Sequence, residues 1–224
     1  VDMTFGNGPW VLPGTISLPK GDGPFPAVVL VHGSGPQDRD ETIGANKPFR
    51  DIAWGLASRG IAVLRYEKRT KQHGQALNPL PLPFTVNEES IDDAIMALAA
   101  VQKHKGIDPA KSYILGHSLG GMLIPRISER AKQATGFIVL AGTTRPLEDV
   151  IIEQSSYLAL LDGSTSVEEQ KQLDAVQLEV NRIKKLSESD ATNPALVFGA
   201  PASYWLDLRN YDPVAKAKQI TKPV

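Results

Sequence analysis

The feature that most constrains this chain is the glycine-rich motif GHSLGG at residues 116–121. An apolar run at residues 113–115 precedes the motif, and a segment with apolar residues at helical spacing, including Met122 and Ile127, follows it. The motif therefore predicts a tight turn that leads from a buried strand directly into a helix. Glycines flank Ser118 in such a turn because any side chain there would collide with neighbouring backbone.

The strands predicted around this turn favour an α/β fold with a mostly parallel sheet. Continuous apolar runs without polar alternation are typical of strands covered on both faces by helices. A helical pattern at residues 48–59 separates two of the runs, and strand and helix alternate along the chain, which predicts right-handed crossovers. An antiparallel hairpin is expected at the sheet edge within residues 1–17. The four apolar runs lie at residues 27–31, 61–64, 113–115 and 137–141.

The domain organisation follows from length and from a change of pattern after residue 141. A chain of 224 residues with 42% hydrophobic side chains is expected to fold as one domain. Two helical patterns then follow each other without a strand, and Ser166 and Glu169 form a capping-box pair at the start of the second. We expect residues 144–206 to be a helical cap inserted into the domain. An ordinary longer crossover is the alternative.

Composition excludes several classes of function. The net charge is −1, with 24 basic and 25 acidic residues, so neither nucleic acid nor an anionic membrane surface is expected as a partner. The sequence contains no run of about 18 apolar residues, the length that a membrane span needs. It contains no cysteine, and no metal cluster, phosphate loop or dinucleotide fingerprint, so we expect no metal and no cofactor. Compartment and oligomeric state stay open.

Ser118 is the candidate nucleophile. A strand-turn-helix setting around G-x-S-x-G forces the serine into a strained conformation and pushes its oxygen out to where a carbonyl group can reach it. The alternative is a glycine-rich turn whose serine merely caps the following helix.

A second glycine motif, HGSGP at residues 32–36, comes directly after the first central strand. In an α/β hydrolase the loop at this place gives one backbone N–H to the oxyanion hole, and the residue after the nucleophile gives the other. We therefore assign these donors to Ser34 and Leu119. Gly33 or Gly35 could replace Ser34, and a turn without a catalytic role is the alternative for the whole motif.

The four histidines do not supply an obvious catalytic base. None follows Ser118, although this fold has the order nucleophile, acid, histidine along the chain. We expect His117 to pack or hydrogen-bond under the turn with its ring away from the serine oxygen, and His32 to support the oxyanion loop. His73 and His104 are expected in solvated positions.

The catalytic acid is also missing from the expected place. Residues 220–224 look like the approach to another buried strand, after which this fold carries its acid and then its histidine. Asp207 and Asp212 precede that strand and are rejected, and Asp212 before Pro213 is expected to form a turn and helix cap. Both catalytic groups are therefore expected beyond residue 224, with the chain incomplete at its C-terminus.

Two charged segments follow neighbouring strands, at residues 37–41 and 65–69. Both should lie at the carboxyl edge of the sheet, where we expect their opposite charges to pair and to hold the surrounding loops. A direct role for Arg39 or Arg69 in binding an anionic substrate is the alternative.

Four stretches together resemble bacterial α/β-hydrolase carboxylesterases, in particular thermostable esterases from environmental DNA in which a smaller N-terminal domain precedes the hydrolase domain. These stretches are residues 26–36, 38–41, 47–49 and 116–121. The resemblance covers nearly the whole chain and is less specific in the cap region. It implies hydrolysis of short- to medium-chain acyl esters through an acyl-enzyme, with Ser118 as nucleophile, a small-molecule ester as substrate and no cofactor.

The resemblance departs from the family at the C-terminus, where the family's acid and histidine have no matching positions. Two kinds of alternative therefore stay open. A thioesterase or peptidase would use the same machinery, and a hydrolase-fold scaffold or fragment without catalysis would bind a small molecule or a partner instead.

Overall fold

The computed structural model describes residues 1–77, 84–193 and 195–224. It divides into two compact units. Unit 1 comprises residues 1–80, 87–142 and 212–224, and unit 2 comprises residues 81–86 and 143–211. No helix of the described residues is long and apolar enough to cross a membrane.

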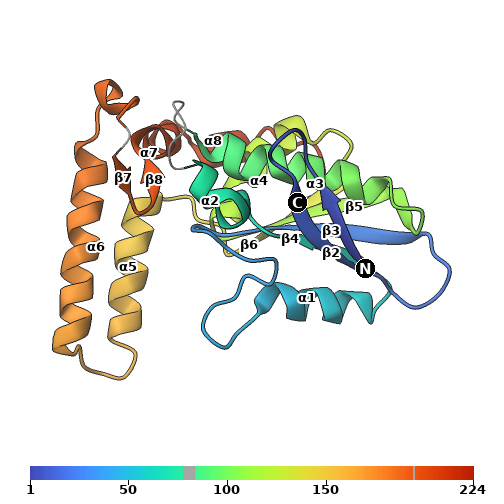
Figure 1. The fold of residues 1–224 in the computed structure, drawn as a ribbon, viewed down its shortest axis with the longest axis horizontal. Helices are drawn as coiled ribbons and strands as arrows, with labels where there is room; N and C mark the ends of the chain where they lie inside the picture. The colour runs from blue at the N-terminus through green and yellow to red at the C-terminus, as the bar shows by residue number, and fades with distance from the viewer. Residues whose placement is uncertain (78–83, 194) are drawn as a thin grey trace. The chain divides into compact units, whose positions relative to one another are not determined.

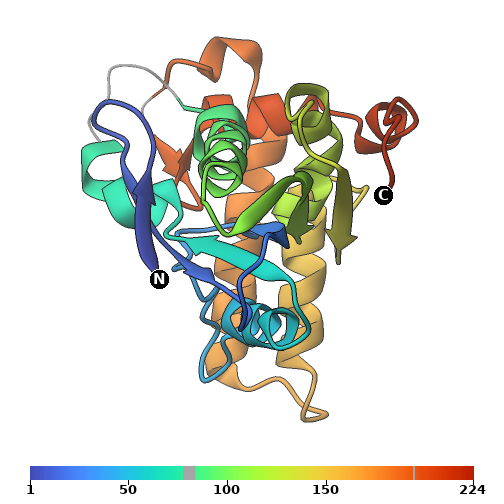
Figure 2. The same cartoon turned by 90° about the vertical axis from the view of Figure 1, so that its right-hand side faces the viewer.

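Unit 1 contains a six-stranded, mostly parallel sheet, as predicted. The strand order is β1-β2-β4-β3-β5-β6, with an antiparallel hairpin at one edge and four parallel strands beside it. Figure 2 shows the blue β1–β2 hairpin at one edge and the olive β6 at the other. The strands are β1 (Asp2–Phe5), β2 (Leu12–Ser17), β3 (Phe25–Val31), β4 (Ala62–Tyr66), β5 (Ile107–His117) and β6 (Gly136–Leu140).

Helices cover both faces of this sheet (Figure 1). Helix α1 (Pro48–Ala57) lies on one face, and α3 (Asp92–Gln102) and α4 (Leu119–Arg130) lie on the other. The continuous apolar runs are explained by this cover, since all five residues of β4 are buried. Unit 1 also contains α2 (Arg69–Leu77), a π-helical turn (Asn87–Ile91) and α8 (Pro213–Ala217).

Strand β6 departs from the expectation of a strand buried on both faces. Ile138, Val139 and Leu140 are each at least 40% exposed. The physical reason is position, because β6 is the last strand of the described sheet and pairs with β5 alone.

The segment around α8 agrees with the prediction for Asp212. Its side chain accepts hydrogen bonds from the N–H groups of Val214 and Ala215, both at 2.9 Å, and so caps the helix. Residues 218–224 are in no strand of the structure, and the expectation that residues 220–224 lead to a further buried strand stays a prediction. Their contact with the sheet is a hydrogen bond of 2.9 Å from the Phe137 N–H to the Pro223 carbonyl.

Unit 2 is built around two consecutive helices, as the helical patterns predicted. These are α5 (Leu147–Ala159) and α6 (Val167–Lys185), and the capping box of Ser166 and Glu169 is present. A 3₁₀ turn (Glu188–Asp190), the short β7 (Leu196–Val197) and β8 (Ala200–Pro201), and α7 (Ala202–Arg209) complete the unit. The function of residues 144–206 as a cap stays a prediction.

Candidate active site

Ser118 lies in a strained turn between β5 and α4. Strand β5 ends at His117 and α4 begins at Leu119, so Ser118 alone connects them. Its backbone has φ 52° and ψ −115°, in a region that costs a non-glycine residue about 1–3 kcal/mol. The Ser118 N–H is held by a hydrogen bond of 3.0 Å to the Leu140 carbonyl. This is the turn that the GHSLGG motif predicted.

The glycines of the motif are required by close backbone approach. A Cβ atom on Gly116 would collide with the carbonyl oxygen of Gly120, and a Cβ atom on Gly120 would collide with that of Val31. A Cβ atom on Gly121 would lie 2.9 Å from the Gly116 carbonyl oxygen. The motif thus holds the start of α4 against both β5 and the end of β3.

The HGSGP loop lies directly beside the serine. A Cβ atom built on Gly33 would be 3.2 Å from the Ser118 Cβ and 3.6 Å from its Oγ. Gly35 has φ +80°, a conformation that glycine adopts without strain. The structure therefore brings together the two glycine motifs that the sequence analysis selected.

The backbone of Gly33 is bound on both sides by buried charged side chains. Its N–H donates to Glu41 Oε1 at 2.7 Å, and its carbonyl accepts from Lys68 Nζ at 2.8 Å. Because the Gly33 N–H is taken by Glu41, it is not available to an oxyanion. Within the described part of the chain, no acceptor binds the Ser34 N–H. This difference favours Ser34 over Gly33 as a donor.

Glu41 also connects the HGSGP loop to the serine turn. Its Oε2 atom lies 2.8 Å from His117 Nδ1. Hydrogen bonding and charge attraction from the Glu41 carboxylate raise the pKa of His117 above its ordinary value, against the opposing effect of burial. His117 thus directs Nδ1 to Glu41 as an ion pair, and the expectation that it packs or hydrogen-bonds under the turn with its ring away from the serine oxygen stays a prediction.

Lys68 has a second partner besides Gly33. Its Nζ lies 3.2 Å from Oε2 of Glu89, and both side chains are almost completely buried. Thr70 donates a hydrogen bond of 2.8 Å to the other oxygen of this carboxylate, Oε1. A buried ammonium group is costly unless it is paired and hydrogen-bonded, and here both conditions are met.

The other three histidines have separate environments. His32 is buried against the rings of Phe49 and Tyr66, with ring centroids 5.1 and 5.0 Å away. Burial, together with the nearby positive charge of Lys68, lowers the pKa of His32 to about 3. The Nε2 atom of His73 lies 2.8 Å from the Val11 carbonyl oxygen.

His104 is the fourth histidine. Its Nδ1 accepts a hydrogen bond of 3.2 Å from the Gly106 N–H. Each of the four imidazoles thus has its own surroundings, and none of these contacts is with Ser118.

The predicted pairing between the two charged loops is present. Arg39 Nε donates to Glu67 Oε1 at 2.7 Å, and Arg65 forms an ion pair with Asp40. These contacts join residues 37–41 to residues 65–69.

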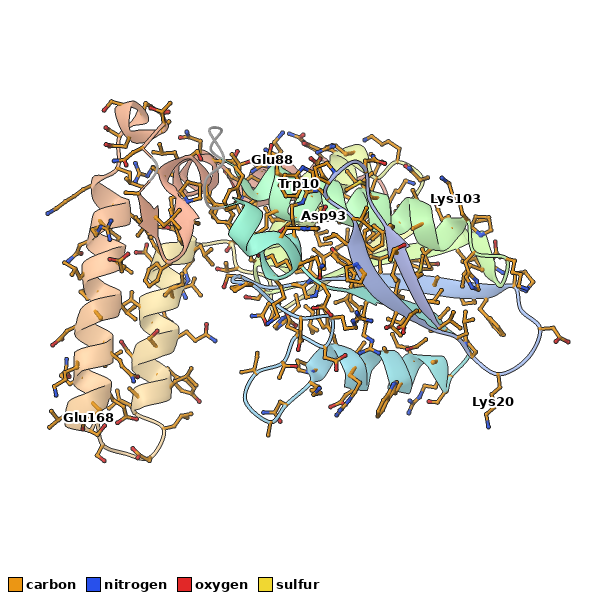
Figure 3. All side chains as sticks on the ribbon, in the orientation of Figure 1. Trp10, Lys20, Glu88, Asp93, Lys103 and Glu168 are labelled. Carbon is orange, nitrogen blue, oxygen red and sulfur yellow. The ribbon has the colours of Figure 1, made fainter. Side chains whose placement is uncertain are left out.

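Arg69, which the sequence analysis placed in the same charged cluster, pairs elsewhere. It forms an ion pair with Asp93 of α3, and its guanidinium carbon lies 5.6 Å from the ring centroid of Trp10. Figure 3 labels Trp10 and Asp93, the two partners of this side chain. Both arginines for which substrate binding was the alternative, Arg39 and Arg69, thus have carboxylate partners.

Among residues 1–77, 84–193 and 195–224, no group of three or more histidine, aspartate or glutamate side chains is arranged to hold a metal ion.

Comparison with known proteins finds similarity in sequence and in fold. The chain is 48% identical over 213 residues to Esterase EstD of Thermotoga maritima, an alignment that covers 95% of this chain and 48% of EstD. Among solved structures, proline iminopeptidase of Mycobacterium smegmatis matches with a TM-score of 0.62 at 15% identity, over 100% of this chain and 80% of that one. The α/β hydrolase GrgF of Penicillium sp. sh18 matches with a TM-score of 0.56 at 14% identity, over 99% and 75%.

The chain has the α/β-hydrolase fold and is similar in sequence to the bacterial esterase EstD. The chain spans about half the length of EstD. No family model matches it. The resemblance to bacterial carboxylesterases and the predicted fold class are both confirmed by these comparisons.

Sequence reasoning missed two side chains of the candidate active site, Glu41 and Lys68. Glu41 belongs to the charged segment 37–41 and Lys68 to the charged segment 65–69, and the sequence predicted only ion pairs between these two segments. Their shared signal was position, since each follows a strand that ends at the edge where Ser118 lies. Which of several charged side chains turns inward to Gly33 depends on tertiary packing, and no spacing rule predicts it.

Proposed function

We propose that the protein is a serine carboxylesterase that cleaves small-molecule esters of short to medium acyl chains through an acyl-enzyme. The observation that carries the proposal is the placement of Ser118, strained at φ 52° and with its side chain against the Gly33 loop. The name of the relative, Esterase EstD, agrees with this chemistry.

In the first step, Ser118 Oγ attacks the ester carbonyl carbon while its proton passes to a histidine. The backbone N–H groups of Ser34 and Leu119 donate to the oxygen that becomes negative. Leu119 is the first residue of α4, so its N–H has no partner within the helix and benefits from the positive end of the helix dipole. Collapse of the tetrahedral intermediate breaks the bond to the alcohol, which leaves with the proton from the histidine.

In the second step, water attacks the acyl-enzyme, and the same histidine takes the proton of the water and returns it to Ser118 Oγ. We assign this base, and the acid that orients it, to a part of the full protein outside residues 1–224. The support is that none of the contacts described above for His32, His73, His104 and His117 is with Ser118. The helices at residues 144–206 are proposed to be a cap.

Kinetics of the full-length protein on a matched ester, thioester and anilide test the proposal. We expect the highest kcat/KM for the ester and loss of activity in Ser118→Ala. A higher kcat/KM for the thioester or the anilide would identify a thioesterase or a peptidase. Binding of the substrate without turnover in the wild type would identify a scaffold.

A further inference from the structure

Lys68 is a buried cation next to the proposed oxyanion hole, and the mechanism above gives it no role. It lies two residues after the end of β4, its side chain is 2% exposed, and its Nζ donates to the Gly33 carbonyl at 2.8 Å. Removing an ammonium group from water is unfavourable unless partners compensate. Its two partners are the Glu89 carboxylate and this single backbone carbonyl.

The carbonyl that Lys68 binds belongs to the peptide group whose N–H is the proposed donor. The carbonyl of Gly33 and the N–H of Ser34 are the two ends of one planar trans peptide, so they point in opposite directions. A side chain that fixes the direction of the carbonyl oxygen therefore also fixes the direction of the Ser34 N–H. Glycine alone would leave this peptide free to rotate.

Lys68 also affects the strength of that donor. A positive charge at a carbonyl oxygen draws electron density from the amide, which makes its N–H a stronger hydrogen-bond donor. Glu41 completes the restraint, because it holds the N–H of Gly33 at 2.7 Å and so fixes the preceding peptide. The loop is thus held by a negative group on one side and a positive group on the other.

We propose that Lys68 is a positioning residue of the oxyanion hole, which orients and polarises the Gly33–Ser34 peptide so that the Ser34 N–H binds the developing alkoxide. The inference rests on the proposed function and adds a residue that does not itself touch the substrate.

A double variant tests the role of Lys68 without leaving a buried charge unpaired. In Lys68→Met with Glu89→Gln, both members of the ion pair become neutral groups of similar shape, and the glutamine can still accept from Thr70. We expect kcat of the full-length protein to fall about 10- to 100-fold, on the order of the loss of one weakened oxyanion donor, while KM stays within about twofold.

The neighbouring ion pair provides a matched control. Arg69 and Asp93 are also buried and also connect the segment after β4 to residues 87–102, but among the described residues their contacts do not include Gly33. The double variant Arg69→Met with Asp93→Asn should therefore keep kcat at equal thermal stability. An equal loss of kcat in the two double variants would overturn the proposal, because the loss would then come from removing any buried pair.

A trifluoromethyl ketone supplies a readout that a merely structural role would not change. Its adduct with a serine oxygen carries a tetrahedral alkoxide, which needs the oxyanion donors, whereas KM for an ester does not. We expect the inhibition constant of the ketone to rise in proportion to the loss of kcat/KM. A loss of kcat with an unchanged inhibition constant would contradict the proposal.

Two milder variants keep the test decisive if the double variant does not fold. Lys68→Arg keeps a cation, and Glu89→Gln keeps Lys68 itself, so each should lose less kcat than the double variant and obey the same proportionality. A loss of kcat in either variant without the matching rise in inhibition constant, or a folded Lys68→Met with wild-type values of both, would overturn the proposal. Activity that survives Ser118→Ala would instead overturn the proposed function.

Discussion

Glu41 and His117 form an ion pair that joins the oxyanion loop to the nucleophile turn, with Oε2 of the glutamate 2.8 Å from Nδ1 of the histidine. The other oxygen of Glu41 accepts the Gly33 N–H. Since His117 directly precedes Ser118, one carboxylate holds both backbone segments between which the proposed mechanism places the ester carbonyl.

The Glu41–His117 pair predicts a pH-dependent contribution to stability. The pKa of His117 is raised above 6.5 in the folded state by Glu41, so this contribution is complete below pH 6.5 and is lost as pH rises through the folded pKa. Glu41→Gln should therefore lower the free energy of unfolding by roughly 1 kcal/mol near pH 6 and by less near pH 9. Denaturant unfolding at both values checks this, and a pH-independent difference would contradict it.

His32 predicts sensitivity to acid. Burial lowers its pKa from 6.5 to about 3, so the neutral form stabilises the fold above pH 6.5 and this stabilisation is lost as pH falls from 6.5 toward 3. The slope is at most about 1.4 kcal/mol per pH unit. In His32→Gln the slope of unfolding free energy against pH should be smaller between about pH 6 and 4. An unchanged slope would mean that His32 does not titrate in this way.

Gly33→Ala tests the approach of the oxyanion loop to the nucleophile. The added methyl group would lie 3.2 Å from Ser118 Cβ and 3.3 Å from Glu41 Oε1, so the loop or the serine has to move by a few tenths of an ångström. We expect kcat/KM to fall at least about 10-fold, because oxyanion geometry is sensitive to such shifts. Gly74→Ala, with open space around its Cβ, is the control. Wild-type kinetics in Gly33→Ala would contradict the assignment of this loop.

Gly120→Ala tests the packing of the turn. Its Cβ atom would collide with the carbonyl oxygen of Val31, a backbone atom of a central strand that cannot move aside cheaply. We expect a loss of about 3 kcal/mol or more in the free energy of unfolding, measured by denaturant titration. Gly55→Ala on α1, where the nearest atom is the end of a flexible arginine at 3.8 Å, should be neutral or stabilising. Equal effects in the two variants would show that the turn tolerates a side chain.

Much of the fold was predictable because its signals are local. The apolar runs of β3 and β4 predicted strands that are covered on both faces. The GHSLGG motif predicted a strand-to-helix turn independently of the rest of the chain. The exposure of Ile138 to Leu140 in β6 was not predictable in the same way, since an apolar run does not reveal whether its strand is central or last in the sheet.

The candidate site was predictable in its glycines and its serine, and less so in its charges. Ser118, Ser34 and Leu119 follow from motif order along the chain. The inward positions of Glu41 and Lys68 arise from contacts between segments 8 and 35 residues from Gly33 in sequence, which only the folded chain brings together.

The most direct test of the central claim is the intact mass of the purified full-length protein before and after treatment with a fluorophosphonate. We expect a single adduct that maps to Ser118 and is absent in Ser118→Ala. An unmodified wild type that is folded, or an adduct that persists in Ser118→Ala, would contradict Ser118 as the nucleophile.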